Sequence, residues 1–139
     1  MRVVVQRSRN SNVTVDNKIV GCINYGLVLF VGFTYGDTEQ DIDYLVKKVI
    51  NLRIFDDEDG VMNKSLLDVG GSILSISQFT LYANTIKGNR PSYIDSLKRE
   101  EAKPLYDLFN QKLRQNNIKV ETGQFGAEML VNINNDGPI

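Results

Sequence analysis

The sequence has 139 residues, of which 42% are hydrophobic and 24% charged, and this length and composition predict a single folded domain over residues 1–139. A formal net charge of −1 excludes a surface that binds polyanions over a broad area, so we expect no DNA partner and only local contact with any nucleic acid. The longest apolar run, near residues 26–34, is far shorter than the roughly 20 residues that cross a membrane, and no signal peptide opens the chain. A single cysteine excludes an internal disulfide. Together these features predict a cytoplasmic protein with no membrane partner.

Strand patterns fill the first third of the chain. Residues 2–7 include three consecutive valines, and β-branched residues favour a pleated strand. Residues 13–23 place two alternating segments on either side of an Asp-Asn turn, which predicts a hairpin. Cys22 in this hairpin is expected to be a small, buried apolar residue, as most free cysteines are. Residues 26–32 are apolar on both faces and predict a central strand.

Two helices are expected. Thr38 offers an N-cap with Asp41 three residues beyond it, and apolar residues at helical spacing follow as far as Leu52. A second helix is predicted over about residues 99–116, where apolar residues share one face and Pro104 is tolerated because it lies near the start.

Further strands are predicted at residues 53–55, 72–82, 118–121 and 128–134. The acid-rich residues 56–60 are interpreted as a solvated turn, because their spacing does not fit a calcium loop. The predicted fold is therefore mixed α/β, with a mixed β-sheet curled into a partial barrel and two helices packed on it.

The most informative absence is histidine, which the chain lacks entirely. This removes Ser-His-Asp and Cys-His catalysis and every histidine-based metal site, so no metal and no cofactor is expected. Three polar or glycine-containing segments remain: residues 77–82, 123–129 and 135–138. From pattern alone each has an ordinary structural explanation as well, namely cross-strand hydrogen bonds, a β-bulge and a turn.

Five segments occur in a characteristic order along nearly the whole chain. They are residues 1–7 (MRVVVQR), 51–55 (NLRIF), 77–82 (SQFTLY), 87–92 (KGNRPS) and 135–138 (NDGP). Together these segments resemble the D-aminoacyl-tRNA deacylase (DTD) family. The resemblance implies a homodimeric hydrolase that cleaves the ester between a D-amino acid, or glycine on alanine tRNA, and the 3′ end of tRNA.

The resemblance also implies how a substrate is selected. The Gly137-Pro138 turn of one subunit, with a cis peptide bond, is expected to enter the active site of the other beside Ser77 to Thr80. Its main-chain oxygens would then accept hydrogen bonds from the α-ammonium group, so that an L side chain is driven into the turn and a D side chain points away. Arg7 is expected to brace the incoming turn across the dimer.

The catalytic group implied by the family is Ser77, Gln78, Phe79 and Thr80. The N–H groups of Phe79 and Thr80 are expected to stabilise the oxyanion of the activated ester. For activation of the attack, assistance by the 2′-hydroxyl of the terminal adenosine is preferred to Thr80 as a nucleophile, since nothing obvious in the sequence would deprotonate Thr80.

Contacts with the rest of the tRNA end follow from the same resemblance. The terminal adenine is expected in a pocket lined by four residues: Phe125, Gly126, Ala127 and Met129. Lys87 and Arg90 are candidates for phosphate contacts. Because the family continues past the Gly-Pro turn into another strand, we also expect a C-terminal strand beyond Ile139.

Two alternative functions share these features. One is an esterase with Thr80 as its nucleophile that acts on other small acyl esters and needs no RNA. The other is a dimeric protein that binds tRNA 3′ ends without hydrolysing them. Deacylation of D-aminoacyl-tRNA distinguishes hydrolysis from binding alone. A substrate without the terminal 2′-hydroxyl, together with Thr80→Ala, distinguishes the deacylase from the esterase.

Overall fold

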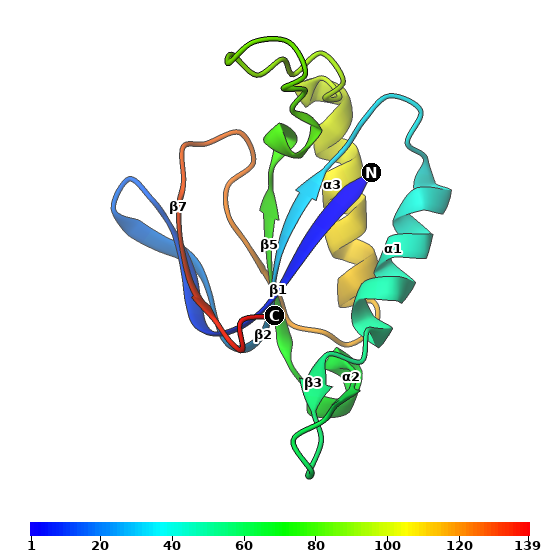
Figure 1. The fold of residues 1–139 in the computed structure, drawn as a ribbon, viewed down its shortest axis with the longest axis vertical. Coiled ribbons are helices and arrows are strands. Elements are labelled where there is room, and N and C mark those ends of the chain that lie inside the picture. The colour runs from blue at the N-terminus through cyan, green and yellow to red at the C-terminus, as the bar shows by residue number, and fades with distance from the viewer.

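A computed structural model describes all of residues 1–139 and is built around one five-stranded sheet (Figure 1). The strand order is β6-β5-β2-β1-β7. The bounds are Arg2–Val15 for β1, Lys18–Gly32 for β2, Ser72–Ser77 for β5, Val120–Thr122 for β6 and Leu130–Asn135 for β7. β1 pairs antiparallel with β2 and β7, whereas β5 pairs parallel with β2 and β6. The predicted mixed α/β class is confirmed.

Two long helices cover one face of this sheet (Figure 1). Helix α1 spans Glu39–Asn51 and opens with the predicted capping box, in which the Asp41 carboxylate accepts from the Thr38 main-chain N–H at 2.8 Å. Helix α3 spans Arg99–Arg114, with Pro104 inside it. Neither helix, nor any other in the protein, is long and apolar enough to cross a membrane. The main core lies between these helices and the sheet and includes Leu27, Leu29, Val31, Ile42, Val46, Ile73, Phe109 and Leu113.

Part of the opposite face of the sheet is covered by β7 and the segment before it. Val28 and Leu74 are fully buried there with Val13, Ile23 and Ile76, and residues of β7 and the segment before it pack against them. Gly26 of β2 has φ +148°, and an added Cβ there would lie 1.8 Å from the Ser72 carbonyl oxygen, so a glycine is needed where β2 passes the start of β5. The edge strands β6 and β7 do not pair with each other, so the sheet stays open and no barrel closes.

Several predicted strands have different bounds in the structure. The segments predicted separately over residues 2–7 and 13–15 are one continuous strand, β1, and residues 19–23 and 26–32 likewise join in β2. The sequence analysis assigned no structure to the residues between these segments, but the ladder continues through them with Arg9 opposite Tyr25. Cys22 lies in β2 as predicted, but its expected burial is wrong because its side chain points to solvent.

The predicted strand over residues 72–82 is wrong beyond Ser77. At that point β5 leaves the sheet, and Phe79–Tyr82 form the 3₁₀ helix η1, held by the Leu81 N–H donating to the Gln78 carbonyl at 3.3 Å. The apolar pattern of the segment continues through this change, so periodicity alone did not reveal it.

The strand predicted at residues 53–55 overlaps the observed strand β3 (Phe55–Asp56) only at Phe55. β3 pairs with β4 (Met62–Lys64), and the one-turn helix α2 (Leu66–Val69) follows; the sequence analysis missed both β4 and α2. The Ser65 hydroxyl accepts from the Asp68 N–H at 3.2 Å, and Gly70 ends the turn at φ +62°. The acid-rich segment of residues 56–60 contains the predicted solvated turn.

Candidate active site

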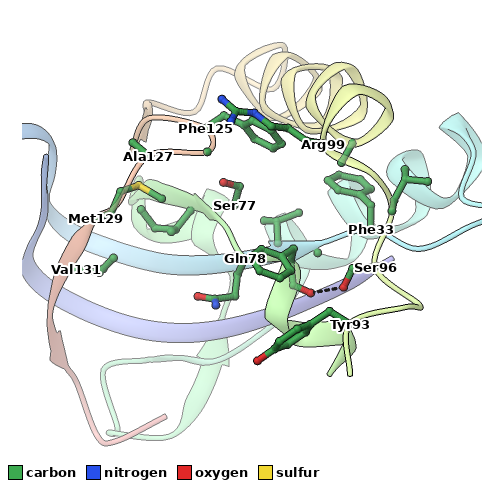
Figure 2. A pocket seen from close by; sticks show the side chains of 17 residues that line it. Phe33, Ser77, Gln78, Tyr93, Ser96, Arg99, Phe125, Ala127, Met129 and Val131 are labelled. Carbon is green, nitrogen blue, oxygen red and sulfur yellow. Dashed lines mark hydrogen bonds between the residues drawn. The ribbon is translucent and has the colours of Figure 1, made fainter. Parts of the chain in front are cut away.

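A cavity of about 630 Å³ opens where β5 ends, between the start of α3 and the segment leading into β7 (Figure 2). Eleven of its 17 lining residues are hydrophobic. The lining combines two of the segments singled out in the sequence: Ser77, Gln78 and Phe79 from one, and Phe125, Gly126, Ala127 and Met129 from the other. Residues separated by more than forty positions in the chain thus form one site.

The polar side of the cavity is built by the change from strand to 3₁₀ helix. Ser77 is the last residue of β5, and the Gln78 N–H donates to the Val31 carbonyl at 2.8 Å. Phe79 and Thr80 then open η1, so their N–H groups precede its first internal hydrogen bond. The Gln78 side-chain amide donates to the Thr80 hydroxyl, and Thr80 itself is not part of the cavity lining.

The apolar side is formed by the segment before β7, which Figure 2 shows with Phe125, Ala127 and Met129 facing the polar groups. The Phe125 ring packs on the buried ring of Tyr106 at a centroid distance of 5.7 Å. Burial raises the pKa of Tyr106, whose hydroxyl donates to the Ser75 carbonyl at 2.7 Å. Tyr106 is therefore a neutral phenol, and it supports the Phe125 ring on the side away from the cavity.

A loop that the sequence analysis passed over completes the cavity. The Ser96 hydroxyl donates to the Phe79 carbonyl at 2.8 Å (Figure 2). The Leu97 N–H donates to the Phe33 carbonyl at 3.0 Å. Tyr93 meets the Phe79 ring edge to face at 5.2 Å. No pattern in the sequence predicts these contacts, because they join a loop to distant main-chain carbonyls.

Arg99 was also missed, although it is the only charged residue that lines the cavity. It occupies the first position of α3, where a cation is unfavourable to the helix dipole. That unfavourable position is the one signal in the sequence that pointed to it.

The Gly137-Pro138 turn lies apart from the cavity of its own chain. Its peptide bond is cis, both residues are exposed, and neither lines the cavity. Arg7, which is 5% exposed, holds this turn: its Nε donates to the Asp136 carbonyl at 3.2 Å, and its main-chain N–H donates to the Ile139 carbonyl at 3.0 Å. Arg7 therefore braces the turn of its own chain, and a contact with a partner's turn stays a prediction.

The remaining predicted residues lie on the surface. Lys87 and Arg90 occupy the exposed loop after η1, outside the cavity lining, and form no ion pair. No three His, Cys, Asp or Glu side chains converge in a way that suits a metal ion. The cavity offers hydroxyl, amide and main-chain N–H groups, together with the Arg99 guanidinium, beside an apolar wall.

The fold and the cavity define an α/β protein whose histidine-free site presents polar groups to one side and an aromatic wall to the other. A family model described as D-Tyr-tRNA(Tyr) deacylase matches residues 4–139, and the chain belongs to this family. It is 55% identical over 139 residues to a protein of Brevibacillus brevis named D-aminoacyl-tRNA deacylase, covering 100% of this chain and 96% of the relative. A relative of the same name from Bacillus thuringiensis is also 55% identical, with 95% of its length covered.

Solved structures give the same fold. One, titled c-Myc DNA Unwinding Element Binding Protein, superposes with a TM-score of 0.94 at 37% identity, covering 100% of this chain and 95% of the other. Another, titled as the analysis of a probable eukaryotic D-amino acid tRNA deacylase, gives a TM-score of 0.83 over 98% of this chain and 94% of the other. At 19% identity this second likeness supports the fold alone.

Proposed function

We propose that this protein acts as its closely similar relatives are named: it is a D-aminoacyl-tRNA deacylase, a hydrolase that cleaves the ester linking a D-amino acid, or glycine on alanine tRNA, to the tRNA 3′ end. The observation that carries the proposal is the cavity, in which Ser77 and Gln78 face Phe125 and Met129 in a full-length member of the family. Because the substrate is aminoacylated tRNA, the proposed place of action is the cytoplasm.

The proposed substrate position follows from the two sides of the cavity. The terminal adenine packs against Phe125, Gly126, Ala127 and Met129, since an aromatic and apolar wall recognises a base by stacking without charge. The ester then lies toward Ser77 and the start of η1. There the N–H groups of Phe79 and Thr80 stabilise the oxyanion, a contribution of roughly 3–4 kcal/mol per donor in other enzymes.

We favour the substrate's 2′-hydroxyl over Thr80 for activating the attack. The Thr80 hydroxyl accepts a hydrogen bond from the Gln78 amide, which is not a base, and Thr80 does not line the cavity. The chain has no histidine to deprotonate it. The terminal ribose brings a hydroxyl next to the ester in every substrate, so the reaction does not need a protein nucleophile.

The proposed chiral filter requires a homodimer of single-domain subunits, residues 1–139. The exposed Gly137-Pro138 turn projects from its own chain, away from its own cavity, and is available to a partner. The sheet face opposite the helices carries the half-exposed Val4 beside Phe30, as well as the buried side-chain amide oxygen Oε1 of Gln6, which has no hydrogen-bond partner. Such a face suits a second copy of the chain.

The test is deacylation by the purified protein of paired D- and L-tyrosyl-tRNA, followed as the half-life of the ester. We expect rapid loss of the D ester and an unchanged L ester. An unchanged D ester would leave only the tRNA-binding hypothesis.

A D-tyrosyl-tRNA with a terminal 2′-deoxyadenosine, together with Thr80→Ala, separates the two catalytic hypotheses. Substrate assistance predicts that the deoxy substrate is inert and that Thr80→Ala keeps most of its activity. Undiminished cleavage of the deoxy substrate, with an inactive Thr80→Ala, would instead support the esterase.

A further inference from the structure

The one charge in the cavity lining belongs to Arg99. Its guanidinium has five N–H donors, yet it takes part in no ion pair and no hydrogen bond within the chain, and no carboxylate lines the cavity. By contrast, Lys103 on the next turn of α3 is paired with Asp107 at 2.7 Å. Arg99 thus presents an uncompensated positive charge at an otherwise uncharged site.

The position of this guanidinium is shaped by Gly126. A Cβ added at Gly126 would lie 2.6 Å from Cζ, 2.7 Å from Nη2 and 3.0 Å from Nε of Arg99, so the whole guanidinium group lies against the main chain at a residue that lacks a side chain. Gly126 also has φ +76°, which glycine adopts without strain. Figure 2 shows the Arg99 side chain beside Phe125, at the apolar wall.

We propose that Arg99 binds the phosphodiester that joins the terminal adenosine of the tRNA to the preceding nucleotide. This inference rests on the proposed function. With the base against Phe125 and the ester at Ser77, the 5′ side of the same nucleotide must leave the cavity, and an anion there meets the only cation of the lining. A planar guanidinium matches a phosphate with two parallel hydrogen bonds.

One phosphate held in this way agrees with the overall charge of the protein. A net charge of −1 does not attract an RNA backbone over a broad surface, so binding energy must come from a few placed contacts. Arg99 supplies such a contact next to the base pocket, whereas Lys87 and Arg90 lie on a loop outside it.

The experiment compares AMP and adenosine as competitive inhibitors of D-tyrosyl-tRNA deacylation by the wild-type protein, Arg99→Gln and Arg99→Lys. We expect the wild type to bind AMP about tenfold more tightly than adenosine, and Arg99→Gln to bind both as the wild type binds adenosine. Arg99→Lys should restore part of the preference, because lysine keeps the charge without the planar fork. With tRNA, Arg99→Gln should raise KM about tenfold at unchanged kcat and reduce the salt dependence of kcat/KM by about one phosphate contact.

Lys103→Gln is the matched control, since it removes a positive charge from the same helix outside the cavity lining, and it should leave the AMP preference and KM unchanged. Equal binding of AMP and adenosine by the wild type would overturn the proposal. So would an Arg99→Gln variant that weakens both ligands equally, since Arg99 would then act on the base or on the shape of the pocket. If the wild type fails to deacylate D-tyrosyl-tRNA, the proposed function fails, while direct calorimetric binding of AMP and adenosine still decides the role of Arg99.

Discussion

The sharpest test of the chiral filter is the substitution Gly137→Val. Gly137 has φ +122°, and a Cβ added there would lie 2.5 Å from Cγ1 and 2.9 Å from the main-chain nitrogen of Ile139. That nitrogen donates to the Asp136 carbonyl at 3.2 Å and closes the turn. A β-branched residue in this region costs about 1–3 kcal/mol, and the turn can relieve it only by opening.

The expected loss of activity follows from that strain. If the open turn is favoured by about 1–3 kcal/mol, the closed turn is populated roughly 5- to 150-fold less, and deacylation of D-tyrosyl-tRNA falls by a similar factor or the D/L ratio shrinks. The melting temperature should change little, because an exposed turn near the end of the chain opens without unfolding the core. Gly60→Val is the control: Gly60 also has a positive φ, +75°, but has open space around it, so valine there strains the backbone of a different turn without a steric clash.

Mixing subunits shows whether the turn acts in the partner's site. Gly137→Val subunits have an intact cavity and Phe125→Ala subunits have an intact turn, so random pairing gives heterodimers with one complete site. This predicts recovery of about a quarter of the wild-type activity from two weakly active proteins. A Gly137→Val variant with normal rate and normal D/L discrimination, or a mixture that recovers nothing, would refute the cross-subunit filter.

Three further outcomes are expected. Phe125→Ala should raise KM for D-tyrosyl-tRNA about tenfold, measured at steady state, because stacking on an aromatic ring contributes roughly 1–3 kcal/mol per base. Arg7→Gln removes the side-chain donor to the Asp136 carbonyl at 3.2 Å and should lower D-deacylation at least tenfold while circular dichroism stays unchanged at 25 °C. Tyr106→Phe removes the 2.7 Å hydrogen bond to the Ser75 carbonyl and should cost about 1–3 kcal/mol of unfolding free energy in urea titrations at neutral pH. Burial raises the pKa of Tyr106, so its neutral form stabilises the fold below about pH 10 and this contribution is lost as the pH rises further; Tyr106→Phe should therefore lose less stability than the wild type between pH 9 and pH 11.

The sequence predicted those parts of the fold that depend on local periodicity. The capping box at Thr38 and the apolar spacing that follows it led to α1 within one residue of its observed end. The end of β5 was not predictable in the same way, since the apolar residues Phe79 and Leu81 continue the pattern of a strand into η1. The residue after the strand is held by tertiary contacts: the Gln78 N–H donates to the Val31 carbonyl at 2.8 Å, and a Cβ added at Gly32 would lie 2.8 Å from the Gln78 carbonyl oxygen.

For the candidate site as well, local motifs were predictable from the sequence and tertiary contacts were not. The segments of Ser77 and Phe125 were recognised from motifs, and the structure brings them together in one cavity. Ser96 and Arg99 were not recognised, because their roles depend on a hydrogen bond to a distant carbonyl and on the missing side chain at Gly126. Neither the hydrogen bond nor the contact with Gly126 produces a pattern that can be recognised in the sequence.

The separation between turn and cavity explains why one chain is insufficient for the proposed filter. The protein can distinguish a D- from an L-aminoacyl group only if the ammonium group, the ester and the side chain of the substrate are each held in place. This requires rigid protein groups on opposite sides of the substrate. The cavity supplies one side through β5 and η1, both anchored in the sheet. The opposing group must be equally rigid, and the only exposed turn in the chain that a buried arginine clamps is the one at Gly137, outside its own cavity. In the proposed homodimer, two-fold symmetry meets this requirement, because each subunit completes the site of the other with the same pair of surfaces.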